Sequence, residues 1–146
     1  MLINFFLHQI FSIQEITNSQ ELTLQKCSPT SIIRINSFGI TGKGYPGSLI
    51  SLKFKASLEG KIENPFLDIQ LYKKGYHIPI IRFHDDLCRP TILQCPATFS
   101  NINYINQITL PSHAEPGAYQ LLLIFREGTK ILACFETLFR INERNS

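Results

Sequence analysis

The chain has 146 residues, a net charge of +3 at neutral pH and four cysteines. Its length suits one domain with a sizeable core. Charged residues make up 17% and hydrophobic residues 44%, a composition that excludes a disordered chain. The basic residues form no stripe and no RNA-binding motif occurs, so we expect no nucleic-acid partner.

The first 13 residues are apolar and about as long as the hydrophobic region of a secretory signal. No lysine or arginine opens this stretch, although Thr17-Asn18-Ser19 offers a small-residue cleavage site. We interpret residues 1–19 as a degenerate signal peptide and residues 20–146 as one domain. The alternative is a short amphipathic helix or a strand extension that stays on the protein.

Strand periodicity dominates after residue 30. It is clearest over residues 49–58, where aliphatic and aromatic residues alternate with serine and lysine. Further runs of this kind occupy residues 31–36, 67–71, 78–83, 102–110 and 131–141. Glycine- and proline-containing turns separate them at intervals of about ten residues. About seven short strands with this spacing predict an all-β sandwich of two antiparallel sheets packed face to face.

Residues 118–125 break the alternation because they are apolar on both faces. A strand of this kind is covered on both sides, by the opposite sheet on one and by a segment or partner on the other. The chain also holds 11 phenylalanines and no tryptophan. Phenylalanine suits a dense core and a greasy pocket wall equally, and the sequence does not separate the two.

Three groups of residues have the chemistry of known sites without the required arrangement. Residues 42–47 read G-x-G-x-x-G, but a strand pattern follows where dinucleotide binding needs a helix, so we interpret them as a loop between strands. His84-Asp85-Asp86 beside Cys88 fan in different directions at a strand end, which favours a solvated corner over a metal site. Ser112-His113 and Glu115 lack a nucleophile elbow. We expect no enzymatic activity, no metal and no cofactor.

The cysteines are the strongest signal in the chain. An even number in a small domain is typical of disulfides, and the alternative is four free thiols in a reducing compartment. Of the three pairings that four cysteines allow, Cys88–Cys95 with Cys27–Cys134 combines a local loop with a tie between the first and last strands. A sandwich accommodates this pairing easily. The chain-entropy model assigns the two bridges about 2.5 and 4.8 kcal/mol.

Five short motifs punctuate the predicted strands: Asp86-x-Cys88, Cys95-Pro96, Leu110-Pro111, Pro116-Gly117-x-Tyr119 and Leu132-x-Cys134-Phe135. Together they resemble the ML family of lipid-recognition domains, over roughly residues 27–141. Within that family the chain looks nearest to phosphatidylglycerol/phosphatidylinositol transfer proteins, through residues 78–83. The resemblance implies an immunoglobulin-like sandwich with an apolar cavity between its sheets and the same two disulfides. It also makes residues 20–146 an ML-type lipid-binding domain.

The function implied is that of a lipid carrier, secreted or in the endolysosomal lumen. It would hold the tails of a phospholipid or sterol between its sheets and touch membrane surfaces transiently. The alternative is a coreceptor-like accessory module that presents a lipid to a protein receptor or enzyme. The candidate cavity walls are the inward-facing residues Leu52, Phe54, Ile69, Leu71, Phe83, Tyr104, Leu121, Leu123, Phe125 and Phe135. Lys43 and Lys73-Lys74 lie on loops, where they serve either solubility or contact with anionic head groups.

Overall fold

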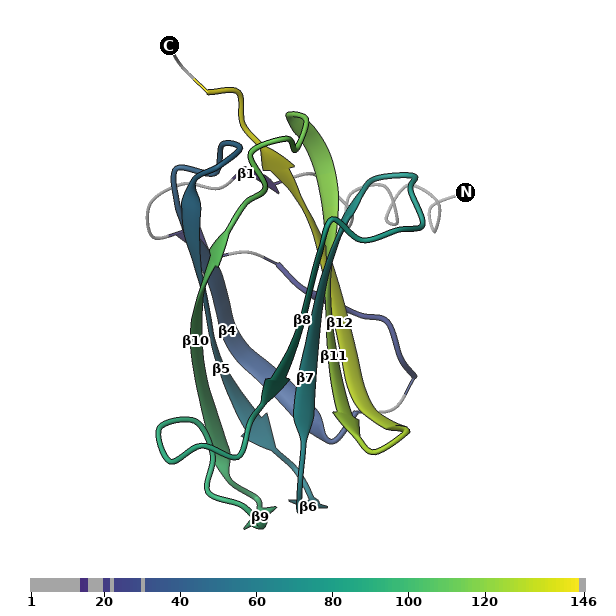
Figure 1. The fold of residues 1–146 in the computed structure, drawn as a ribbon. Helices are drawn as coiled ribbons and strands as arrows, with labels where there is room; N and C mark the ends of the chain where they lie inside the picture. Colours follow the sequence, from purple (N-terminus) through teal and green to yellow (C-terminus); the bar gives the residue numbers. More distant parts are fainter. Residues whose placement is uncertain (1–13, 16–19, 22, 30, 145–146) are drawn as a thin grey trace, which may run out of the picture.

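The computed structural model describes residues 14–15, 20–21, 23–29 and 31–144. Those residues form strands and turns but no helix. The described part of the chain therefore contains no helix long and apolar enough to cross a membrane. Two sheets face each other (Figure 1). The first has the order β1-β12-β11-β7-β8, with β3 also paired to β12, and the second has the order β10-β5-β4-β2. The expected all-β, immunoglobulin-like sandwich is confirmed.

The strands of the first sheet are β1 (Gln14–Glu15), β3 (Gln25–Lys26), β7 (Phe66–Lys73), β8 (Ile81–Asp86), β11 (Gly117–Glu127) and β12 (Lys130–Ile141). Those of the second are β2 (Gln20–Glu21), β4 (Ile33–Gly42), β5 (Leu49–Leu58) and β10 (Asn101–Thr109). A separate short pair joins β6 (Lys61–Ile62) to β9 (Ala97–Thr98). The segment predicted as a signal peptide, 1–19, lies outside the described residues except for β1, which pairs in parallel with β12.

The alternation predicted for β5 is present, because its four apolar residues from Ile50 to Ala56 are all buried. In β7 the polar face is buried as well. The carboxylate of Asp68 accepts a hydrogen bond from Arg126 Nε at 2.7 Å and contacts His84 Nδ1 at 2.6 Å. Tyr72 donates to Gln70 Oε1 at 2.6 Å. These polar partners cover a face that alternation alone would leave in water.

The two-faced strand β11 has a clear inward side. Leu121, Leu123 and Phe125 are buried, whereas Leu122 and Ile124 are half-buried on the outer side. The strand lies between β7 and β12, with Leu123 opposite a residue of each neighbour. The face directed at the other sheet therefore carries the predicted candidates of this strand.

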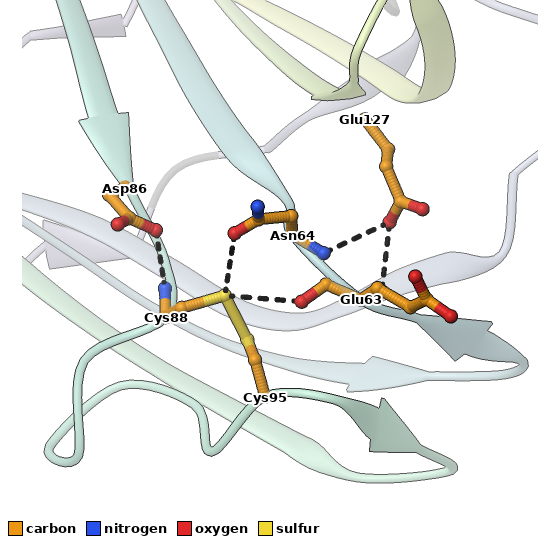
Figure 2. Close-up of a disulfide and its surroundings, with 6 residues drawn as sticks. All are labelled: Glu63, Asn64, Asp86, Cys88, Cys95 and Glu127. Atoms are coloured by element: carbon orange, nitrogen blue, oxygen red, sulfur yellow. Dashed lines mark hydrogen bonds between the residues drawn. A yellow bond between two sulfur atoms is a disulfide. The ribbon is translucent and has the colours of Figure 1, made fainter.

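Both predicted disulfides are present, Cys27–Cys134 and Cys88–Cys95. The second closes a loop at the end of the sandwich that holds β6 and β9 (Figure 2). There the Cys88 amide donates to Asp86 Oδ1 at 2.9 Å. The carboxylate of Glu127 accepts hydrogen bonds from the amides of residues 63 and 64, at 3.0 and 3.3 Å. This end of the molecule is tied by both a covalent bridge and charged caps.

Residues 43–48 connect two antiparallel strands, β4 and β5, as predicted for the glycine-rich segment. Gly42 begins the turn with φ of +129°, and an added Cβ there would lie 2.7 Å from the carbonyl oxygen of Leu49. The glycine is therefore explained by close backbone approach rather than by phosphate binding.

Candidate binding site between the sheets

A small cavity lies between the two sheets at one end of the sandwich. Its volume is about 10 Å³, which is room for roughly one water molecule. Every residue around it is apolar: Ile40, Ile50, Leu52, Ile69, Leu71, Ile81, Ile108, Leu121 and Phe139. Most of them sit close to strand ends, near the loops 43–48, 74–80 and 110–116, which gather at that end in Figure 1. A void with such walls stays dry.

The predicted wall residues divide into two groups. Four of them line the cavity: Leu52, Ile69, Leu71 and Leu121. Five others are buried but do not line it: Phe54, Tyr104, Leu123, Phe125 and Phe135. The remaining one, Phe83, is 38% exposed.

Most of the aromatic candidates fill the middle of the sandwich, but Phe135 also lines a more open pocket of about 280 Å³ together with residues of β3 and β4. Phe54 stacks on Tyr104 with ring centroids 4.9 Å apart and meets Phe125 edge-on at 5.7 Å. Phe125 in turn meets Phe135 edge-on at 6.1 Å. Rings that interlock in this way pack closely between the sheets. The void with all-apolar walls therefore lies at one end of the sandwich and does not run the length of the strands.

Phe83 lies on the edge strand β8, opposite the cavity-lining Ile69 in register. Residues directly opposite each other in an antiparallel pair share a face, so Phe83 belongs to the inner face. It is exposed because β8 ends its sheet. The ring thus stands at the open edge between β8 and β10, beside the cavity instead of within its wall.

A polar bridge crosses that open edge. Tyr104 of β10 donates its phenol hydrogen to Asp85 Oδ2 of β8 at 2.6 Å. Asn106 Nδ2 donates to the phenol oxygen at 3.2 Å, and Arg89 donates to Asp85 Oδ2 at 3.0 Å. Burial raises the pKa of Tyr104 well above its usual value of 10, and the hydrogen bond to Asp85 adds to the rise. The phenol stays protonated and links one sheet to the other.

The bridge bears on two expectations for His84-Asp85-Asp86, that the three residues form a solvated corner and that their side chains fan in different directions. Asp85 is part of an inter-sheet contact and not of a solvated corner, because its side chain faces inward from β8. His84 and Asp86 have other partners, Asp68 and the Cys88 amide. The three consecutive side chains therefore fan apart, which leaves them without a common centre.

Five cavity residues escaped the sequence reasoning: Ile40, Ile50, Ile81, Ile108 and Phe139. Four of them lie on predicted strands, whereas Ile40 lies beyond residue 36, where the first predicted strand ends, because β4 extends to Gly42. The alternating directions of successive strands could have identified these residues. Because neighbouring strands run antiparallel, the end of β4, the start of β5 and the end of β10 meet at one level.

No protein-family model matches the chain, and no curated protein matches its sequence. Among solved structures, a Niemann-Pick type C2 protein from Japanese carpenter ant superposes with a TM-score of 0.65 at 12% identity. That match covers 83% of this chain and 100% of the ant protein. Chicken MD-1, solved in complex with lipid IVa, matches at a TM-score of 0.46 and 14% identity, over 82% and 99% of the two chains. The first match shows that the two chains share a fold.

Proposed function

We propose that this protein binds the apolar tails of a lipid between its two sheets and carries the lipid between membranes. The observation that carries the proposal is the cavity between the sheets, whose walls are apolar throughout. Two further points support it. The chain has the fold of a Niemann-Pick type C2 protein, and its cysteine and proline motifs resemble those of the lipid-binding ML family.

The small size of the cavity makes sheet opening part of the mechanism. A cavity with room for roughly one water molecule is far smaller than a lipid tail of ten or more methylenes. The sheets must separate at the aliphatic end to admit a tail. Each methylene moved from water into the cleft contributes about 0.8 kcal/mol, so ten methylenes supply about 8 kcal/mol toward that separation.

The ligand class that we propose is a phospholipid such as phosphatidylglycerol or phosphatidylinositol, with a sterol as the other candidate. Two disulfides suit an oxidising compartment, so we place the protein outside the cell or in an endolysosomal lumen. A receptor-bound, lipid-presenting role needs an exposed apolar patch outside the cleft. The outer side of β11 does not form such a patch, because Leu122 and Ile124 are half-buried there, and this favours the carrier.

Transfer of a fluorescent phospholipid from donor to acceptor vesicles tests the proposal. We expect the rate to rise in proportion to protein concentration, and purified protein to elute with lipid bound. Fluorescence that remains in the donor vesicles at every protein concentration would contradict the carrier function.

A matched pair of variants locates the site. Leu121→Phe adds volume at the cavity wall, whereas Leu122→Phe adds the same ring to the outer side of the same strand. Where thermal unfolding shows both to be folded, we expect at least an order of magnitude loss of transfer from Leu121→Phe and a rate near the wild type from Leu122→Phe. Equal rates would place the lipid elsewhere.

A further inference from the structure

The loop between β7 and β8, residues 74–80, exposes two large apolar side chains. Ile78 is 80% exposed and Tyr76 is 63% exposed. The loop projects from one end of the sandwich (Figure 1), which is the end that holds the cavity. Ile81, which directly follows the loop, lines the cavity. Apolar side chains held in water next to a binding site indicate a contact surface.

The loop is braced so that its apolar side chains stay outside. The Ile80 amide donates to the carbonyl of Leu71 at 2.7 Å, and the Tyr76 amide donates to the carbonyl of Lys73 at 2.9 Å. The ammonium of Lys73 lies 5.3 Å from the centre of the Tyr76 ring and also pairs with Glu115 of the neighbouring loop. Both pairings position the tyrosine ring without burying it.

Positive charge flanks this apolar tip. Lys74 belongs to the loop, and Arg82 follows it on the outer face of β8. Among the described residues neither takes part in a salt bridge, while the acid of the adjacent loop, Glu115, is neutralised by Lys73. An apolar tip flanked by cations complements an anionic bilayer, because the acyl chains accept the apolar side chains and the lipid phosphates attract the cations.

We propose that the loop 74–80 docks the protein on anionic membranes, with Tyr76 and Ile78 entering the interface and Lys74 and Arg82 contacting lipid phosphates. The inference rests on the proposed function, for which it supplies the site of lipid exchange. A bilayer fits better than a protein partner because two side chains are far too few for a stable protein interface, which buries about 800 Å² on each side. Docking here brings the cavity wall at Ile81 next to the membrane.

Sedimentation with vesicles tests the loop directly. The probes are phosphatidylcholine vesicles with and without phosphatidylglycerol. We expect the double variant Tyr76→Ser/Ile78→Ser to lose at least about tenfold in binding to the anionic vesicles. The matched control is Ile105→Ser/Ile131→Ser, which removes two exposed aliphatic side chains that lie outside the loop and should leave binding within about twofold of the wild type.

The charge contribution is tested with Lys74→Glu. We expect about a fivefold or larger loss on the phosphatidylglycerol vesicles and little change on pure phosphatidylcholine, because only the former attract a cation. Equal losses on both vesicle types would contradict the role of charge.

Lipid loading is measured separately, with a short-chain phospholipid dissolved below its micelle concentration. The loop variants should load as the wild type does. Wild-type protein that docks through the loop but loads no lipid would remove the carrier function and leave the docking inference standing. A double variant that binds vesicles as well as the wild type, or a wild type that binds neither vesicle type, would overturn the docking inference whatever the loading result.

Discussion

The two ends of the sandwich are built differently. One end is tied by the Cys88–Cys95 disulfide and by the Glu127 carboxylate, which caps the turn that enters β7 (Figure 2). The other end carries the cavity, whose wall is aliphatic apart from Phe139. Interlocked aromatic rings fill the region between the two.

This difference assigns separate roles to the two halves. A half held by a covalent bridge and by ring contacts resists separation, whereas a half held by aliphatic contacts around a void lacks part of its packing energy. Local opening draws on the part with the fewest well-packed contacts. We infer that the sheets part at the cavity end and pivot on the tied end.

Removal of the Cys27–Cys134 disulfide should have the largest effect on stability. Cys27→Ser/Cys134→Ser is expected to lower the free energy of unfolding by about 5 kcal/mol, and Cys88→Ser/Cys95→Ser by about 2.5 kcal/mol, because the loops that they close differ in length. The sequence separations are 107 and 7 residues. Urea unfolding followed by circular dichroism measures both.

The local disulfide also tests the division of roles. The Cys88→Ser/Cys95→Ser protein, where it remains folded, should load short-chain phospholipid as the wild type does, since the bridge is at the end away from the cavity. A folded variant with no loading would show that the tied end takes part in binding, and the two-half description would fail.

Two leucines on one strand give the next test. Leu123 is fully buried and does not line the cavity, while Leu121, two residues earlier on the same face, does. We expect Leu123→Ala to cost about 3–4 kcal/mol and Leu121→Ala about 2 kcal/mol, because the wall residue has fewer contacts to lose. Urea unfolding measures the loss in the free energy of unfolding for each variant. Equal losses, or a larger loss at Leu121, would mean that the cavity end is packed as tightly as the middle.

Much of the fold could be predicted because its signals are local. The alternation in β5, the turn at Gly42 and the spacing of the cysteines each reflect a physical constraint within a short segment. The strand's own sequence does not determine which face of β11 is inside, since both faces are apolar. Only the pairing with β7 and β12 decides it.

The position of the cavity was harder to predict from the sequence. Phe54 and Leu52 occupy equivalent inward positions of β5, yet one is locked against Tyr104 and the other borders the void. Packing between sheets depends on which side chains meet across them, and alternation along one strand carries no information on that. The bridge from Tyr104 to Asp85 was missed for the same reason, as it joins residues of opposite sheets.

That bridge stands at the open edge, where the two halves meet, and its removal should give the smallest effect on stability. We expect Tyr104→Phe to lower the free energy of unfolding by about 1–2 kcal/mol, since Asp85 keeps Arg89 as a partner. Lipid loading should become faster, because β8 and β10 lose a bond that holds the edge closed. Tyr119→Phe is the matched control, as its phenol donates to the nearby carbonyl of Glu115, four residues earlier in the chain.

The pH dependence of stability gives this bridge a signature of its own. Burial raises the pKa of Tyr104 above the usual value of 10, so above pH 10 the folded protein keeps a proton that the unfolded chain has lost. The stabilisation is complete below pH 10 and falls as the pH rises toward the folded pKa, by up to about 1.4 kcal/mol per pH unit. The free energy of unfolding, measured with urea above pH 10, should therefore fall more gradually with pH in Tyr104→Phe than in the wild type. Parallel curves would mean that the phenol does not resist ionisation, and loading no faster than in Tyr119→Phe would mean that it does not hold the edge closed.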